Sequence, residues 1–227
     1  MAEDLVEGGT DQLGEKIGVF GGTFDPVHNG HCILASQFKQ QCGLDSVVVI
    51  PAAIPPHKLS SPLAEFEQRY TMLSLAFAGI QNVFISRLEQ FRKGPSFTID
   101  TLCELKNAID GKQQLFFAIG ADALAEIHTW KQYRNIPNLA CLVVFSRKFG
   151  SIPLPEKIAG KAFPDYYFAK DNRSFFAKNE EKIRLLGMPP VDISSSRIKQ
   201  AIATGEKWQD LVPKAVCAYI VDHHLYK

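Results

Sequence analysis

One stretch constrains the fold more than any other: residues 17–38, which read I-G-V-F-G-G-T-F-D-P-V-H-N-G-H-C-I-L-A-S-Q-F. Its first four residues predict a short buried strand. The strand ends at Gly21 and Gly22, where the missing side chains let the backbone turn closely past another molecule. Apolar residues then recur at helical spacing from Ile33, and Gly43 is placed to end that helix. A strand, a glycine turn and a helix in direct succession predict an α/β fold.

The start of this predicted helix carries two imidazoles. Asn29 is the expected N-cap, His31 falls in the first turn, and His28 stands just before the helix. Unpaired backbone N–H groups and the positive end of the helix dipole meet there, which suits a phosphate group. Taken singly, a glycine pair is usually only a turn, and two nearby histidines usually lie on the surface. Their combination in one strand–helix unit favours a phosphate site.

The composition is that of an ordinary globular enzyme. Of the 227 residues, 46% are hydrophobic and 22% are charged, which supports one sizeable core. The formal net charge of +1 gives no electrostatic case for a nucleic acid or an anionic membrane as partner. We therefore expect a small ligand, for which a local basic pocket is sufficient.

The cysteines argue against both a disulfide framework and a structural zinc site. They are odd in number, widely spaced and without a C-x-x-C pair. The five are Cys32, Cys42, Cys103, Cys141 and Cys217. Most have apolar neighbours and are expected to fill the core, so no metal ligands are predicted.

The first 15 residues are acidic and contain several glycines, the reverse of a signal or transit peptide. We expect a loose acidic tail over residues 1–15 and a single domain over residues 16–227. No apolar run approaches the length of a bilayer span, so we expect a cytoplasmic protein with no membrane contact. The residues carry no signal for a particular oligomeric state.

Further apolar runs predict a Rossmann-like open parallel sheet with helices on both faces. Strand, helix and strand over residues 17–50 would form a right-handed βαβ unit. Further strands are expected at 83–85, 115–119, 141–145 and 182–186, with helices over 64–78 and 98–108 and a last helix that begins at Pro213. Neither G-x-G-x-x-G nor G-x-x-x-x-G-K-[ST] occurs, so phosphate must be held in another way.

Residues 149–180 are poorly periodic and rich in aromatic side chains. Two interpretations are open. The segment is either an insertion that packs its aromatic residues on the sheet edge or an oligomer contact, and the insertion is favoured.

The stretch G-G-T-F-D-P-V-H-N-G-H resembles the first signature of the nucleotidyltransferases with an H-x-G-H element, and most of all the bacterial nicotinate mononucleotide adenylyltransferases. The resemblance runs from Ile17 to the C-terminus, except in the aromatic segment. It implies a nucleotidyltransferase fold and transfer of the adenylyl group of ATP to nicotinate mononucleotide, in NAD biosynthesis. It also implies that His28 and His31 are catalytic, holding the phosphates, and that Mg²⁺ accompanies ATP.

A second phosphate element is predicted at residues 191–199, V-D-I-S-S-S-R-I-K. Three serines and two cations at one helix start either suit a polyphosphate or form a solvated cap. The stretch resembles the family signature I-S-S-T-x-I-R, which implies that it holds the leaving pyrophosphate. Ser196 replaces Thr, and Lys199 replaces Arg, which keeps the charge but loses the planar fork. Whether Arg197 or Lys199 contacts phosphate is left open.

Gly120 and Asp122 follow the strand predicted at 115–119. From spacing alone, Asp122 either accepts hydrogen bonds from a ribose or caps the next helix. I-G-A-D resembles the family's I-G-x-D, which holds the adenylate ribose. Together, these resemblances assign ATP binding to Gly21, Gly22, Thr23, Phe24, Gly120, Asp122, Arg147, Ser194, Ser195, Ser196, Arg197 and Lys199.

His57 and Lys58 lie in a proline-rich loop that leaves the carboxyl end of the second strand. Spacing alone favours a solvated loop tip, whereas P-P-H-K resembles a family loop that faces the mononucleotide phosphate. P-S-F-T-I resembles the segment whose backbone N–H groups, at Thr98 and Ile99, contact the nicotinate carboxylate. Without the resemblance, this is only a helix capped by Ser96 or Thr98, with Thr101 and Glu104 at a second capping-box spacing.

Trp130 follows in H-T-W-K. An isolated tryptophan is usually part of the core, but the family places one here, stacked on the pyridine ring. The resemblance therefore implies that Trp130 binds the nicotinate face and that Lys131 supplies a neighbouring backbone N–H.

Other classes of protein share parts of this sequence pattern. A related transferase would use nicotinamide mononucleotide or phosphopantetheine as acceptor, or a cytidylyl donor, and P-S-F-T-I with H-T-W favours nicotinate. A class I aminoacyl-tRNA synthetase core shares the H-x-G-H element, but the near-neutral charge and short chain count against it. A nucleotide-sensing domain without catalysis would not need two histidines beside two phosphate sites.

Overall fold

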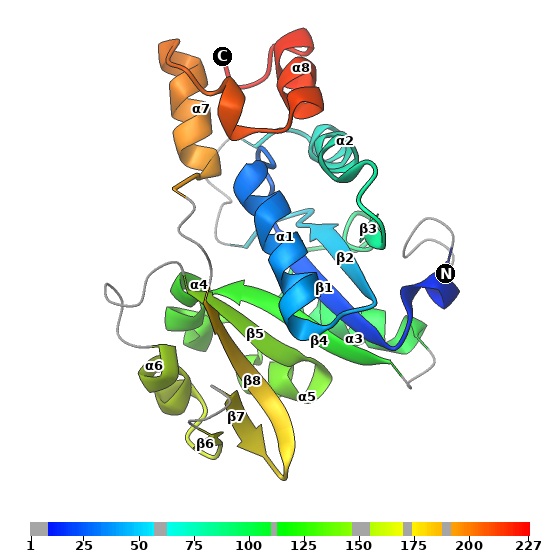
Figure 1. Ribbon diagram of the computed structural model, residues 1–227, viewed down its shortest axis with the longest axis vertical. Helices are drawn as coiled ribbons and strands as arrows, with labels where there is room; N and C mark the ends of the chain where they lie inside the picture. The colour runs from blue at the N-terminus through cyan, green and yellow to red at the C-terminus, as the bar shows by residue number, and fades with distance from the viewer. Residues whose placement is uncertain (1–8, 57–62, 110–112, 147–154, 170–173, 188–191) are drawn as a thin grey trace.

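The structure is a computed structural model that describes residues 9–56, 63–109, 113–146, 155–169, 174–187 and 192–227 (Figure 1). Its eight described strands form one sheet in the order β3-β2-β1-β4-β5-β8-β7-β6. They are β1 (Lys16–Gly22), β2 (Ser46–Pro51), β3 (Val83–Ile85), β4 (Gln114–Gly120), β5 (Cys141–Ser146), β6 (Tyr167–Ala169), β7 (Ser174–Ala177) and β8 (Glu180–Gly187). The strands from β3 to β8 in this order run parallel, and β7 and β6 are antiparallel. The predicted Rossmann-like sheet is confirmed.

Helices cover both faces of the sheet. They are α1 (Asn29–Cys42), α2 (Phe66–Phe77), α3 (Thr98–Ala108), α4 (Ala121–Ala125), α5 (Ile136–Leu139), α6 (Pro155–Ala162), α7 (Ser195–Thr204) and α8 (Lys214–Asp222). Alternate strand residues point to opposite faces. Val19 and Ile50 join the core under α3, α4, α5 and α6, whereas Phe20 and Val49 join the core under α1, α2, α7 and α8. The strands are therefore buried on both sides, as parallel strands usually are.

Helix α1 begins one residue earlier than expected, at Asn29 itself. His28 occupies the N-cap position, so the prediction that Asn29 caps the helix is wrong. Asn29 is the first helical residue, and its side chain donates a hydrogen bond to the Asp210 carbonyl at 2.9 Å instead. The predicted end at Gly43 is confirmed, with a left-handed backbone (φ 59°) that glycine adopts without strain.

Helix α3 has its predicted bounds, but none of the expected hydroxyl caps. Phe97 occupies the N-cap position without a side-chain cap. The hydroxyl of Ser96 instead accepts a hydrogen bond from the Ile54 N–H at 3.1 Å, because the proline-rich loop lies beside it. Thr98 is the first helical residue and Thr101 lies inside the helix, so both capping predictions are wrong. Pro213 likewise precedes α8 as its N-cap rather than beginning it.

The described part of the aromatic segment extends the sheet. Helix α6 leads into β6 and β7, which add to the sheet beyond β8. Phe163 and Phe175 are buried, and the ring of Phe163 stacks on Tyr166 with centroids 5.3 Å apart. The aromatic residues therefore pack at the sheet edge, as the favoured interpretation expected.

The chain is packed onto the domain before residue 15. Thr10–Leu13 form the 3₁₀ turn η1, and Leu13 is completely buried. The Ser46 hydroxyl donates to the Leu13 carbonyl at 2.6 Å. The structured part thus begins ahead of the boundary proposed from composition, and residues 1–8 of the expected tail lie outside the described residues. None of the described helices has the length and apolarity that a membrane span requires.

Candidate active site

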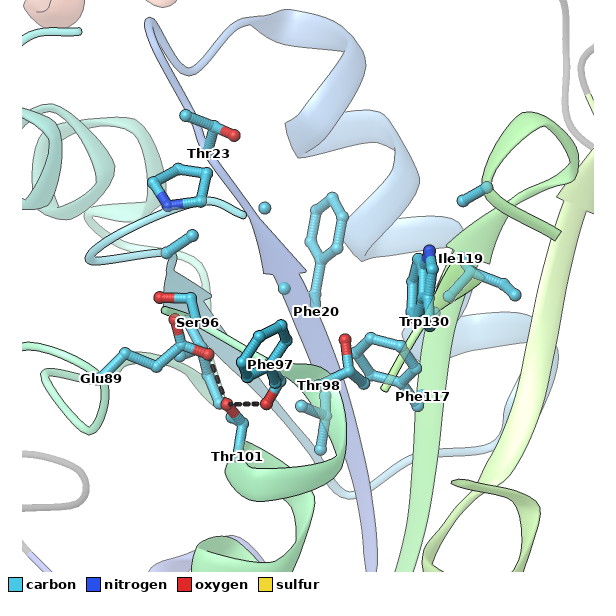
Figure 2. A pocket seen from close by; sticks show the side chains of 18 of the residues that line it. Phe20, Thr23, Glu89, Ser96, Phe97, Thr98, Thr101, Phe117, Ile119 and Trp130 are labelled. Atoms are coloured by element: carbon cyan, nitrogen blue, oxygen red, sulfur yellow. Dashed lines mark hydrogen bonds between the residues drawn. The ribbon is translucent and has the colours of Figure 1, made fainter. Parts of the chain in front are cut away.

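A cavity of about 360 Å³ opens where β1, β2 and β4 reach their carboxyl ends (Figure 2). This is the edge at which open α/β sheets bind ligands, and the volume suits a small molecule. The predicted site residues that line it are Gly21, Gly22, Thr23, Thr98, Gly120 and Trp130. Predicted ATP-binding and acceptor-binding positions thus meet in one cavity.

Asp25 lies in the loop between β1 and α1, two residues after the cavity-lining Thr23, and only 2% of it is exposed. Its Oδ1 accepts hydrogen bonds from the Ala64 N–H at 3.1 Å and the Tyr226 hydroxyl at 2.8 Å. Its Oδ2 accepts one from the Lys199 ammonium at 2.8 Å. Burial raises the pKa of Tyr226 above its ordinary value, and the charge of Asp25 and the hydrogen bond to it act in the same direction. Because a buried carboxylate needs such donors, Asp25 holds together segments from across the chain.

Arg69 is a second buried side chain that binds the loop between β1 and α1. Its guanidinium donates to the carbonyls of Ala64 at 3.0 Å, Thr23 at 2.8 Å and Ala52 at 2.8 Å. Burial lowers the pKa of Arg69, and the charge of Asp25 opposes that shift. Sequence reasoning did not single out Arg69. Its place in the apolar stripe of α2 was the available signal for burial.

The starts of α1 and α7 come together. The Ser195 hydroxyl donates to the Pro26 carbonyl at 2.9 Å across 169 positions of sequence. Ser194 is the N-cap of α7 and accepts from the Arg197 N–H at 3.3 Å, so the predicted serine cap is confirmed. Ser196 lies in the first turn and is exposed. The two helix starts predicted to bind phosphate are therefore neighbours.

The two cations of α7 have different surroundings. Lys199 points inward to Asp25, and 30% of its side chain is exposed. Arg197 pairs with Asp192 at 3.2 Å, and 61% of its side chain is exposed. Lys199 is therefore the cation that the fold holds against the loop between β1 and α1.

The histidines form a stacked pair at the start of α1. His28 is buried, and its ring lies 3.7 Å from that of His31, centroid to centroid. The His28 N–H donates to His31 Nδ1 at 3.2 Å, which assigns the neutral tautomer of His31 with its proton on Nε2. The Phe24 ring packs edge-on against His31 and is buried, so only the Phe24 backbone can meet a ligand. His31 is thus presented as a hydrogen-bond donor.

Two glycines at the cavity lie close to neighbouring side chains. A Cβ on Gly22 would come within 2.9 Å of the Phe24 ring, and one on Gly120 within 2.2 Å of Asp122 Oδ1. Gly120 itself is the N-cap of α4, so the alternative that Asp122 caps this helix is wrong. The exposed Asp122 carboxylate lies over Gly120, at the cavity edge.

Trp130 lines the cavity beside Ile119 and Phe117 (Figure 2). It is half-buried and packs edge-to-face on Phe117 with centroids 6.4 Å apart. The Lys131 ammonium pairs with Asp100 at 2.8 Å. Thr98 lines the cavity where α3 begins, and the side chain of Ile99 is buried below it. The predicted residues His57, Lys58 and Arg147 lie outside the described residues.

Comparison with known proteins agrees with this geometry. A sequence model of the cytidylyltransferase-like family matches residues 19–201. A protein of Chromobacterium violaceum, named as a probable nicotinate-nucleotide adenylyltransferase, is 36% identical over 217 residues, which are 95% of this chain and 100% of the relative. A relative of the same name in Thermus thermophilus is 37% identical over 215 residues, 93% and 100% of the two chains.

This chain belongs to the nicotinate-nucleotide adenylyltransferase family. A solved structure, the nicotinic acid mononucleotide adenylyltransferase of Plasmodium falciparum complexed with NaAD, has the same fold, with a TM-score of 0.73 at 20% identity over 94% of this chain and 98% of that one. The same Plasmodium enzyme complexed with APC gives a TM-score of 0.71 at 18% identity, with the same coverage.

Proposed function

We propose that this protein transfers the adenylyl group of ATP to nicotinate mononucleotide, forming nicotinate adenine dinucleotide and pyrophosphate. The observation that carries the proposal is the contact between the two helix starts, Ser195 to Pro26. Each start offers backbone N–H groups and a positive dipole end, and together they can hold one triphosphate. The family to which the chain belongs supports the same reaction.

In the proposed reaction, a phosphate oxygen of the mononucleotide attacks the α-phosphorus of ATP in line. The bond from that phosphorus to the bridging oxygen breaks, and pyrophosphate leaves with the electron pair. Such a displacement needs positioning and charge stabilisation rather than a covalent intermediate. His31 Nε2–H donates to the α-phosphoryl oxygens and His28 holds the phosphates beside it. Ser194, Ser195, Ser196 and Lys199 hold the leaving pyrophosphate.

Of the α7 cations, we assign phosphate contact to Lys199 rather than Arg197. The inward position of Lys199 beside the loop between β1 and α1 supports the assignment. Gly21, Gly22, Thr23 and the backbone of Phe24 would lie along the triphosphate. Gly120 and Asp122 would hold the adenylate ribose, since a carboxylate can accept hydrogen bonds from two hydroxyls. Arg147 is assigned to ATP by resemblance.

The nicotinate mononucleotide would occupy the part of the cavity that Thr98 and Trp130 line. The pyridine ring would stack on Trp130, and its carboxylate would accept hydrogen bonds from the backbone N–H groups of Thr98, Ile99 and Lys131. The N–H groups of Thr98 and Ile99 lie at the start of α3, where the helix dipole favours an anion. His57 and Lys58 are assigned to the mononucleotide phosphate by resemblance.

Mg²⁺ would enter with ATP as part of the substrate. Among the residues that the structure describes, no group of three or more histidine, cysteine or acidic side chains is arranged to hold a metal ion. Mg²⁺ prefers oxygen ligands, keeps several waters and is often bound chiefly through substrate phosphates. The described side chains therefore fit a Mg²⁺ ion that arrives bound to the triphosphate, rather than one held by the protein.

The test is pyrophosphate release with Mg²⁺ and ATP. Nicotinate mononucleotide is compared with nicotinamide mononucleotide, with phosphopantetheine, and with tRNA plus amino acids; CTP replaces ATP in a further reaction. We expect the nicotinate substrate with ATP to give the highest kcat/KM. A higher kcat/KM with another pair would replace the proposed substrates, and no turnover with any pair would contradict a transferase.

A further inference from the structure

Glu89 is a buried acid in the cavity wall that the sequence did not point to. Only 7% of the residue is exposed, yet it lines the cavity. One carboxylate oxygen, Oε1, accepts a hydrogen bond from the Thr101 hydroxyl in α3. The other, Oε2, is buried and has no hydrogen-bond partner among the described residues. Within the described residues, Glu89 Oε1 therefore accepts a hydrogen bond and Oε2 accepts none.

The charge of Glu89 is balanced by Arg92. Arg92 Nη2 lies 3.3 Å from Glu89 Oε1 and donates to the Thr101 hydroxyl at 2.8 Å. Arg92 does not line the cavity, whereas Glu89 and Thr101 do. The guanidinium and the threonine thus both engage Oε1, and neither engages Oε2.

An unsatisfied buried carboxylate oxygen is costly, so this position favours a hydrogen-bond donor from water or from a ligand that enters the cavity. Figure 2 shows Glu89 and Trp130 at opposite ends of the cavity. Ser96 lies beside Glu89 in this view, and Pro55, Pro56 and Thr23 also line the cavity. Arg92 already balances the charge of Glu89 from outside the cavity, so a neutral hydrogen-bond donor is sufficient for the open oxygen.

We propose that Glu89 Oε2 accepts a hydrogen bond from a ribose hydroxyl of the mononucleotide acceptor. The inference rests on the proposed function, in which the pyridine ring stacks on Trp130. The sugar is then the next group along the acceptor, and its hydroxyls are its neutral donors. Glu89 selects for an intact ribose in the acceptor, as Asp122 is proposed to do for the ATP ribose.

The first test compares Glu89→Gln with the matched control Glu104→Gln. Glu104 also lies near Arg92, with 3.3 Å between Oε1 and Nη1, but it does not line the cavity. We expect Glu89→Gln to raise the KM for nicotinate mononucleotide about 10-fold while the KM for ATP stays unchanged, since a charge-assisted bond becomes a neutral one. Glu104→Gln should leave both unchanged. A parallel change of both KM values in Glu89→Gln, or no change in either, would overturn the proposal.

The second test removes the hydroxyls from the substrate. With the wild-type protein, we expect the 2′-deoxy or the 3′-deoxy acceptor to lose about 10- to 100-fold in kcat/KM, because the site is left with an unpaired buried acceptor. In Glu89→Ala that loss should disappear; if this variant does not fold, the same comparison is made in Glu89→Gln, where it should shrink. Equal losses in wild type and variant would overturn the proposal. Wild-type turnover of the intact acceptor reports separately on the proposed function.

Discussion

The Tyr226 hydroxyl donates a hydrogen bond to Asp25 Oδ1 at 2.8 Å, although the two residues lie 201 positions apart. Helix α8, which precedes Tyr226, packs beside α2 (Figure 1). Tyr226 is thereby tied to the loop between β1 and α1, which leads from Gly22 to His28. The C-terminus is part of the support of the candidate active site rather than an appendage.

Tyr226→Phe should destabilise the protein and slow its reaction. The change removes one of the two hydrogen bonds that the buried Asp25 Oδ1 accepts, at a cost of about 1–3 kcal/mol. The loss is measurable as a lower urea midpoint at unchanged m-value. Because the loop positions the histidines, kcat should fall with it. Tyr219→Phe, which removes a hydroxyl from the neighbouring helix α8, is the control. Equal stability of the two variants would contradict the role of the Asp25 contact.

Alkaline pH should lower the free energy of unfolding more in the wild-type protein than in Tyr226→Phe. Burial and the charge of Asp25 raise the pKa of Tyr226 in the folded state above the ordinary tyrosine value of 10.0. The unfolded chain then releases this proton first, so stability is fully present below pH 10 and is lost as pH rises above it. Urea unfolding from pH 8 to 11 should show that the free energy of unfolding falls more steeply with pH in the wild type than in Tyr226→Phe. The same pH dependence in both proteins would contradict a raised pKa of Tyr226.

His31→Ala should lower kcat by about 10²- to 10³-fold, the usual effect of removing one oriented donor at a developing charge. The stacking of His31 on His28 and its hydrogen bond from the His28 N–H hold Nε2 in place. The measurement is steady-state pyrophosphate release under the proposed substrates. His224→Ala, at an exposed position near the C-terminus, is the control. Near-normal turnover of His31→Ala would remove this residue from the mechanism.

One cysteine should react much faster than the others. Cys103 is exposed on α3, whereas Cys42 and Cys141 are buried. Burial raises the pKa of Cys32 to about 11 and that of Cys141 to about 12, so little thiolate forms there at pH 8. Mass spectrometry after brief iodoacetamide treatment of the native protein should find modification at Cys103 first. Comparable early labelling of Cys141 would contradict the packing.

Much of the fold follows from local sequence alone. The β-branched run of β2, the apolar stripes of α2 and α3 and the glycine that ends α1 each act over a few residues, and the structure confirms these elements. The helix starts at His28 and Ser194, which are predicted to bind phosphate, could be recognised from the sequence for the same reason. A glycine turn, a cap and a helical period are properties of neighbours in sequence.

What the sequence did not reveal depends on partners far away in the chain. Asn29 and Ser96 were expected to cap helices, but each hydrogen-bonds another segment, because tertiary contacts offered a competing partner. The Tyr226 contact to Asp25 and the orphan oxygen of Glu89 have no local signal at all. Sequence by itself determined the strands of the parallel sheet, helices α1, α2 and α3, and the positions at which α1 and α7 begin. Only the packed sheet brought those starts together, since burial and hydrogen-bond competition are decided in three dimensions.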